Sequence, residues 1–210
     1  MISPLRSVLL LGVLFLVGAC SSTVVRYHSL MPDLAVPADP AGGLARPGKP
    51  LLFSIQPVGL PALVDRQEFV ARQGGQVLIL ENERWATMLG DEMREALGTY
   101  LQRALGGRNV TGLVPPPDAP VLGVTLMVRQ FESAPGQYTL VDADWALALQ
   151  GRGEKGERML CHAHNLTKAP VGGGGNAELA KSYQAAFAML AGQIAESGRR
   201  WMASERGVCP

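Results

Sequence analysis

The chain has 210 residues, of which 47% are hydrophobic and 18% are charged, and this size and composition predict one packed domain with flanking segments. It carries 19 Lys and Arg residues against 18 Asp and Glu residues, and loss of an N-terminal signal that contains Arg6 leaves 18 of each. A formally neutral chain gives no indication of the basic stripe or strongly basic domain that is typical of nucleic-acid binding, so we expect no nucleic-acid partner.

The first 19 residues have the layout of an export signal. Arg6 and the amino terminus supply the positive end, and residues 8–17 form an apolar core. This core is too short for a bilayer-spanning helix, which needs roughly 20 apolar residues. Small residues follow and lead to Cys20.

Val17-Gly18-Ala19-Cys20 is similar to the lipobox of bacterial lipoproteins, in which the cysteine is acylated and becomes the first residue after cleavage. We therefore expect residues 1–19 to be removed, Cys20 to be lipidated and residues 20–23 to form a short tether. Three acyl chains would hold such a protein permanently at a membrane. Ser21, where retained inner-membrane lipoproteins often carry Asp, favours the outer membrane. The alternative is an ordinary cleavage site that precedes a cysteine by chance.

The first half of the mature chain predicts strands, a hairpin and a helix. Residues 24–30 and 51–58 have strand composition, and the Pro- and Gly-rich stretch 31–50 between them predicts an exposed loop. Gly74-Gly75 separates two β-compatible runs, 68–73 and 76–81, and predicts a hairpin turn. Apolar residues recur at intervals of three and four from Trp85 to Leu105, which predicts an amphipathic helix that ends at Gly106.

The second half predicts an antiparallel meander followed by a helix. A short strand over 109–114 precedes three β-runs, 121–132, 137–150 and 157–167, that are joined by short turns. The last helix follows Gly172–Gly175, with Asn176 as its N-cap, and ends near Trp201. We predict an α+β domain over residues 24–205, with a single mixed, mostly antiparallel sheet, two amphipathic helices packed on one face, and a tail at 206–210.

No pattern of residues predicts catalysis or a bound cofactor. Cys161-His162-Ala163-His164 is the most metal-like cluster, but on a strand the two histidines point away from the cysteine, and two ligands are too few for a closed zinc site. Asp142 and Asp144 share one strand face, which is more typical of a solvated surface than of acid–base catalysis. Gly172–Gly175 lacks the Lys and Ser of a phosphate loop, and no GxSxG motif occurs. We therefore expect neither an enzyme nor a metal site.

Cys161 and Cys209 are the two thiols that remain once Cys20 is lipidated. The envelope is an oxidising compartment, so a disulfide between them would tie the tail to the sheet. Because Cys209 is one residue from the end, it could equally be free, and both alternatives stay open.

Several short motifs occur in one order along the chain: Arg26-Tyr27, Leu60-Pro61, Val64-Asp65-Arg66, Gly74-Gly75, Arg84-Trp85, and the strands with Phe131 and Trp145. With these motifs, residues 58–105 above all resemble the PqiC/YmbA family of ABC-type transport auxiliary lipoproteins. The resemblance covers most of the mature chain, and it departs from the family pattern at Leu63-Val64, where the family often has Tyr before Leu-Asp-Arg.

The resemblance implies a non-catalytic component of a system that moves lipids between the two bacterial membranes. Its partners would be an MCE-domain protein that spans the periplasm, the outer membrane through the lipid anchor, and further copies of the chain if it forms a homo-oligomer. An independent envelope lipoprotein that binds a small ligand, lipid or metal is the alternative.

Four residues at the start of the resemblance are candidate partner contacts. Pro61 fixes φ and lacks a donor, so Leu60 to Val64 should leave the sheet and present Asp65 and Arg66 at an edge. The candidates are Leu60, Pro61, Asp65 and Arg66, with a local Asp65–Arg66 ion pair as the alternative. Trp85 and Trp145 are expected to be structural, Trp85 by pinning the hairpin to the helix that it opens.

Overall fold

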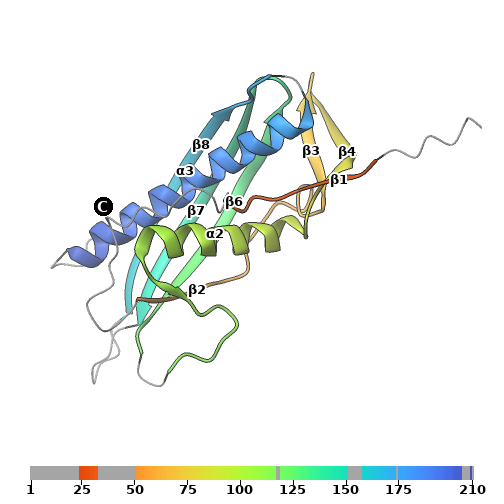
Figure 1. The fold of residues 1–210 in the computed structure, drawn as a ribbon. Helices are drawn as coiled ribbons and strands as arrows, with labels where there is room; N and C mark the ends of the chain where they lie inside the picture. The colour runs from red at the N-terminus through yellow and green to blue at the C-terminus, as the bar shows by residue number, and fades with distance from the viewer. Residues whose placement is uncertain are drawn as a thin grey trace, which may run out of the picture.

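A computed structural model describes residues 24–32, 51–116, 119–150, 158–173, 175–204 and 209. The expected signal, Cys20, residues 33–50 and nearly all of the tail lie outside these residues. The described part has an α+β fold, which confirms the predicted class (Figure 1). Its elements are β1 (Arg26–His28), β2 (Leu52–Ile55), β3 (Glu68–Gln73), β4 (Gln76–Trp85), α2 (Leu89–Leu105), β5 (Arg108–Asn109), β6 (Val121–Ala134), β7 (Tyr138–Gln150), β8 (Arg158–Pro170) and α3 (Asn176–Ala203).

The described strands form two sheets, so the prediction of a single sheet was wrong. One has the strand order β1-β4-β3 and the other β5-β2-β6-β7-β8. The chain after β2 follows β6 as far as Gly59, whose N–H donates to Leu126 O at 3.0 Å. Pro61 then offers no N–H, and the chain turns away from β6. The ladder therefore stops, and β3 pairs with β4 instead of with β6.

Both predicted hairpin regions form, since each depends on local signals. Gly74 and Gly75 have φ values of 55° and 79°, the left-handed conformation that a two-residue hairpin turn requires. β6, β7 and β8 form the predicted antiparallel meander, and β6 is bulged between Val128 and Gln130. The strand expected over 109–114 is reduced to the two residues of β5.

α2 and α3 cover one face of the five-stranded sheet, as predicted (Figure 1). Side chains on β7 alternate between this buried face and an open one: Val141, Ala143 and Trp145 are buried, whereas Asp142 and Asp144 are partly exposed. α2 ends at Gly106, with φ of 63° and its N–H on Gln102 O. Among the described helices, neither combines the length and apolarity needed to span a bilayer.

Two boundary predictions were wrong. Trp85 does not open a helix, because its N–H donates to Gln67 O at 2.7 Å and it forms the last residue of β4. Asn176 is the first residue of α3 rather than its N-cap, and Gly175 precedes it with φ of 116°. The Asn176 amide instead donates to the carboxylate of Glu83 at 3.1 Å.

Aromatic rings join the two sheets to α3. Trp85 stacks on Phe69 with ring centroids 4.1 Å apart, and Phe131 of β6 stacks on Tyr183 of α3 at 4.2 Å. Trp85 and Tyr183 also meet edge to face at 5.6 Å. Trp145 is buried farther along β7, where its Nε1–H donates to Asn165 Oδ1 at 2.6 Å. Both tryptophans thus have the packing positions expected of structural residues.

The structure joins Cys161 and Cys209 by a disulfide, with Cα atoms 4.9 Å apart. Cys161 of β8 is fully buried, whereas His162 and His164 of the same strand are exposed on its opposite face, as the strand pattern predicted. The bond closes a loop with a sequence separation of 48 and attaches the end of the chain to the sheet.

Replacing Trp85 by alanine should lower the free energy of unfolding by about 3–5 kcal/mol, because a large ring is lost where both sheets and α3 meet. Chemical denaturation followed by circular dichroism measures this change. Tyr27→Ala is the control: its ring is 62% exposed, so a change of about 0.5 kcal/mol or less is expected. Equal losses in the two variants would contradict the packing described.

The disulfide predicts that native protein purified without reductant has no reactive thiol at Cys161 or Cys209. Alkylation under denaturing, non-reducing conditions should leave both unmodified, and mass spectrometry after prior reduction should find both modified. Cys209→Ser should lower the free energy of unfolding by about 2–4 kcal/mol, the usual contribution of such a bond. Alkylation of both residues without reductant would exclude the bond.

Candidate functional site

Two buried carboxylates hold the segment that directly follows the expected lipid anchor. The first is Glu83 of β4, whose side chain is 2% exposed. Its carboxylate accepts a hydrogen bond from Arg26 Nη1 at 3.0 Å and lies 2.6 Å from His28 Nε2. With the bond from Asn176, it connects β1, β4 and the start of α3.

The second buried carboxylate is Glu92, in the first turn of α2 and also 2% exposed. It accepts hydrogen bonds from the Ser29 hydroxyl, from Leu30 N at 2.7 Å and from Thr87 Oγ1 at 3.3 Å. All three donors are neutral, and the positive end of the helix dipole favours the negative charge. α3 adds a bond from Gln184 Nε2 to Ser29 O at 2.7 Å.

These contacts fix β1 and the residues after it from three sides. β1 pairs in parallel with β4, from Arg26 opposite Glu83 to His28 opposite Trp85. Leu30 is fully buried in the core. The segment that begins four residues after Cys20 is thus an integral part of the domain.

A tight turn follows β2 at residues 60–66. Val64 N and Asp65 N both donate to Pro61 O, at 3.0 and 3.2 Å. Val64 is buried, whereas Leu63 is 45% exposed at the tip of the turn. The sequence prediction of an ordered connection that leaves the sheet is correct for these residues.

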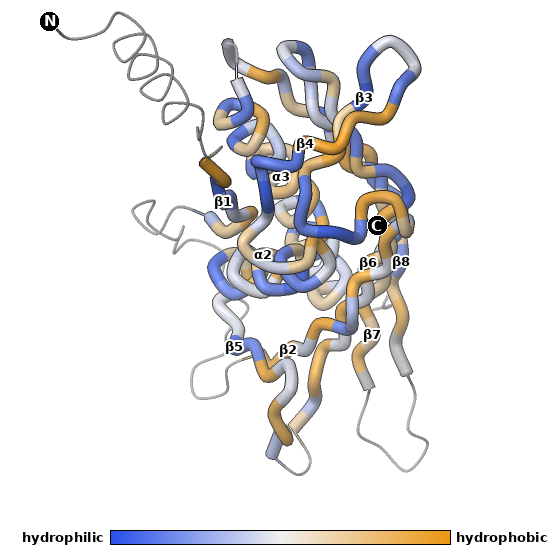
Figure 2. Tube along the Cα trace, turned by 90° about the vertical axis from the view of Figure 1, so that its right-hand side faces the viewer, coloured by the Kyte–Doolittle hydropathy of each residue, from blue (hydrophilic) through white to orange (hydrophobic). Residues whose placement is uncertain are grey.

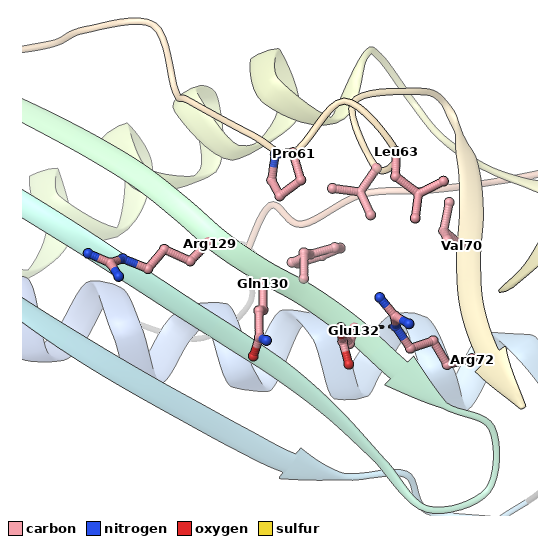
Figure 3. A pocket seen from close by; sticks show the side chains of 9 residues that line it. Pro61, Leu63, Val70, Arg72, Arg129, Gln130 and Glu132 are labelled. Atoms are coloured by element: carbon pink, nitrogen blue, oxygen red, sulfur yellow. Dashed lines mark ion pairs between the residues drawn. The ribbon is translucent and has the colours of Figure 1, made fainter. Parts of the chain in front are cut away.

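A pocket of about 180 Å³ lies between this turn, β3 and β6 (Figure 3). Apolar side chains from the turn, Val70 of β3 and Phe131 of β6 form much of its lining. Arg72 Nε and Glu132 Oε1, 3.0 Å apart, form an ion pair between β3 and β6 at its edge. The lining residues are Pro61, Leu63, Val64, Val70, Arg72, Arg129, Gln130, Phe131 and Glu132.

The four candidate partner residues do not gather in the pocket. Pro61 lines it, whereas Leu60 packs against the core. Asp65 lies beside the start of α2, since a Cβ added to Gly90 would be 3.5 Å from its Oδ1. Arg66 Nε is 3.8 Å from Glu68 Oε2, a pairing different from the local one considered with Asp65.

The open face of the five-stranded sheet carries a polar cluster. The two ring nitrogens of His164 lie 3.1 Å from Asp142 Oδ1 and from Asp144 Oδ1. Arg129 Nε donates to Asp144 Oδ2 at 2.5 Å, and this bond is the largest influence that lowers the pKa of Asp144. Both carboxylates therefore face cationic or donor groups, an arrangement unlike the split pair needed for acid–base catalysis.

Metal binding gains no support from the described residues, which contain no group of three or more His, Cys, Asp or Glu side chains arranged to hold an ion. Sequence reasoning missed the two buried carboxylates and most of the pocket lining. The partners of Glu83 on β1 are 55 and 57 residues away in sequence, so no local pattern could reveal them.

A family model described as "ABC-type transport auxiliary lipoprotein component" matches residues 33–195. No curated protein sequence matches the chain. The match spans the turn at 60–66, both sheets apart from β1, and most of α3.

Two solved structures share the fold. One, described as an uncharacterized protein, is 20% identical, with a TM-score of 0.60 over 82% of this chain and 97% of that one. The other, from Xanthomonas campestris and assigned to the family DUF330, is 12% identical, with a TM-score of 0.57 over 84% of this chain and 95% of that one.

Glu83 predicts an acid-sensitive attachment of β1. Burial opposes ionisation, but hydrogen bonds from His28, Asn176 and Arg26 outweigh it and lower the pKa of Glu83 below its ordinary value of 4.5. A depressed pKa contributes stability that is fully present above 4.5 and is lost as the pH falls through the folded-state value. Denaturation at a series of pH values should therefore show this loss.

Glu83→Gln is the matching variant. It should lower the free energy of unfolding at pH 7 by about 1–3 kcal/mol, since neutral bonds replace charge-assisted ones. The difference from the parent protein should shrink below pH 4.5. Glu95→Gln, at an exposed position on α2, is the control and should show no such convergence. A constant difference across the acid range would refute the role of Glu83.

Proposed function

The chain belongs to the family of ABC-type transport auxiliary lipoprotein components, and from this membership we propose that it docks an MCE-domain protein at the outer membrane. In this proposal the lipid on Cys20 anchors the domain, and the domain binds the partner without catalysing a reaction. The family assignment supports a role in transport and a location in the bacterial envelope. The MCE partner and the outer-membrane location are the proposed part.

The fixed N-terminal segment supports an anchored docking role. If Cys20 is acylated, only residues 21–23 lie between the anchor and the first described residue, Val24. Glu83 and Glu92 hold the following residues to the domain, so no long linker separates the folded part from its membrane. A domain held this way presents its surfaces at a nearly constant height above the bilayer.

The observation that carries the proposal is the preformed pocket beside the turn at 60–66. Its volume of about 180 Å³ is below the roughly 300–1,000 Å³ of small-molecule sites. It suits one side chain of a protein partner better than a lipid with its acyl chains. Leu63 beside it is 45% exposed and provides an apolar contact of the kind that anchors protein interfaces.

The polar clusters support a non-catalytic role. Asp142 and Asp144, the only paired carboxylates considered for catalysis, are engaged with Arg129 and His164 on an open sheet face. The pocket holds one carboxylate, Glu132, which is paired with Arg72. Neither arrangement in the described residues provides an activated nucleophile with a base.

Leu63→Asp should weaken capture of the MCE-domain protein proposed as the partner. The experiment captures full-length lipidated protein from solubilised envelopes and quantifies the co-purified MCE protein. We expect a loss on the order of tenfold, because a charged group in an apolar contact removes at least about 1.4 kcal/mol.

The control is Leu113→Asp, since Leu113 is 61% exposed and lies outside the pocket. It should capture as much MCE protein as the parent chain. If Leu63→Asp captures as much MCE protein as the parent chain, the pocket is not the binding site. If the parent chain captures no MCE protein in several detergents, that result counts against docking itself.

A further inference from the structure

We propose that the outward face of the three-stranded sheet, at the end where β1 begins, lies against the lipid bilayer that holds Cys20. This inference rests on the proposed acylation of Cys20. The residues that would contact the bilayer, called here the membrane-facing surface, are Val24, Val25, Tyr27, Val77 and Ile79.

All five side chains are unusually exposed for apolar or aromatic residues. Val24 is 70% and Val25 38% exposed, and Tyr27 at the centre of β1 is 62% exposed. On β4, Val77 is 40% and Ile79 45% exposed. No other described element covers them.

Strand register places Tyr27 and the two β4 residues on the face away from the core. His28 pairs with the buried Trp85, so Tyr27, one residue earlier, points the opposite way. Phe69 is buried against Trp85 and pairs with Leu80, so Ile79 lies on the other face of the hairpin, which it shares with its partner Val70 beside the pocket. Val77 lies two residues from Ile79 and shares its face.

The length of the tether favours the lipid bilayer as the partner that covers the membrane-facing surface. From Cys20 to Val24 the chain advances four residues, which span at most about 14 Å when fully extended. β1 cannot supply more length, because Glu83 and Glu92 hold it in place. An acylated Cys20 therefore keeps Val24 within about 14 Å of the level at which the acyl chains enter the bilayer.

β1 begins at the end of the molecule that holds the three-stranded sheet (Figure 1). In Figure 2 the start of β1 has hydrophobic colour, and the β3–β4 hairpin, across the view from it, has hydrophobic colour below a hydrophilic turn. The segment after β5, which includes Leu113 and Val114, lies at the opposite end in both views. A membrane near Val24 is thus closer to the three-stranded sheet than to that segment.

The residue types fit a membrane interface. Tyr has an apolar ring with a polar tip and is enriched at the level of lipid headgroups. Aliphatic side chains at the boundary add affinity in proportion to the apolar area that they bury. Weak individual contacts are sufficient here, because the lipid anchor already holds the domain at the surface.

Site-directed fluorescence quenching tests the inference on the full-length acylated protein. Ile79→Cys is labelled with bimane and reconstituted into vesicles of phosphatidylethanolamine and phosphatidylglycerol that contain nitroxide-labelled phosphatidylcholine. Val114→Cys is the control, because Val114 is 97% exposed at the opposite end. The unsubstituted protein measures any labelling of Cys161 or Cys209. Intact mass of each preparation shows whether Cys20 carries its acyl chains.

We expect the probe at position 79 to lose most of its fluorescence and the probe at position 114 to keep it. Tyr27→Cys provides a second position and should behave like position 79. Equal quenching at 79 and 114 in acylated protein overturns the inference and leaves the anchor intact. The inference is also overturned if the probe at position 79 is shielded from an aqueous quencher but is not quenched by the nitroxide lipid. That result would mean that a second copy or a protein partner, and not the bilayer, covers the membrane-facing surface. Absence of acyl chains overturns both the anchor and the inference.

Discussion

Two carboxylates without access to water hold the N-terminal segment, which follows the expected lipid anchor, to the folded domain. Burying a charge is unfavourable unless its oxygens are fully hydrogen-bonded, and Glu83 and Glu92 meet this requirement with donors from the N-terminal segment. If that segment detached, both carboxylates would lose partners while buried. The N-terminal donors and the two buried carboxylates therefore stabilise one another, and these hydrogen bonds keep β1 attached to the domain.

If Cys20 is acylated, this attachment orients the fold relative to the membrane. The aromatic contacts of Trp85 with Phe69 and Tyr183 pack the three-stranded sheet against α3. The segment from Arg26 to Leu30 connects the domain to the expected anchor at a fixed point. With that anchor, the pocket beside Leu63 would be held in one arrangement relative to the bilayer, as the proposed docking of an MCE-domain protein requires.

Sequence reasoning succeeded where structure depends on neighbours along the chain. The Gly74-Gly75 turn, the meander and both helices follow from local patterns. It failed at Trp85, because the apolar spacing of α2 continues backward into the end of β4. It also failed on the number of sheets, since whether the β3–β4 hairpin joins the edge of the larger sheet depends on non-local contacts. Glu83 and the pocket were missed for the same reason.

Hydrogen–deuterium exchange of the full-length lipidated protein tests the central claim most directly. The amide of Leu30 donates to the buried carboxylate of Glu92, so it should exchange as slowly as the amides in the middle of α2. The hydrogen-bonded amides in peptides covering Arg26 to Leu30 should gain deuterium only on the timescale of global unfolding. Exchange of this segment within the time of an unstructured chain would show that β1 is not part of the folded domain, and the account would be wrong.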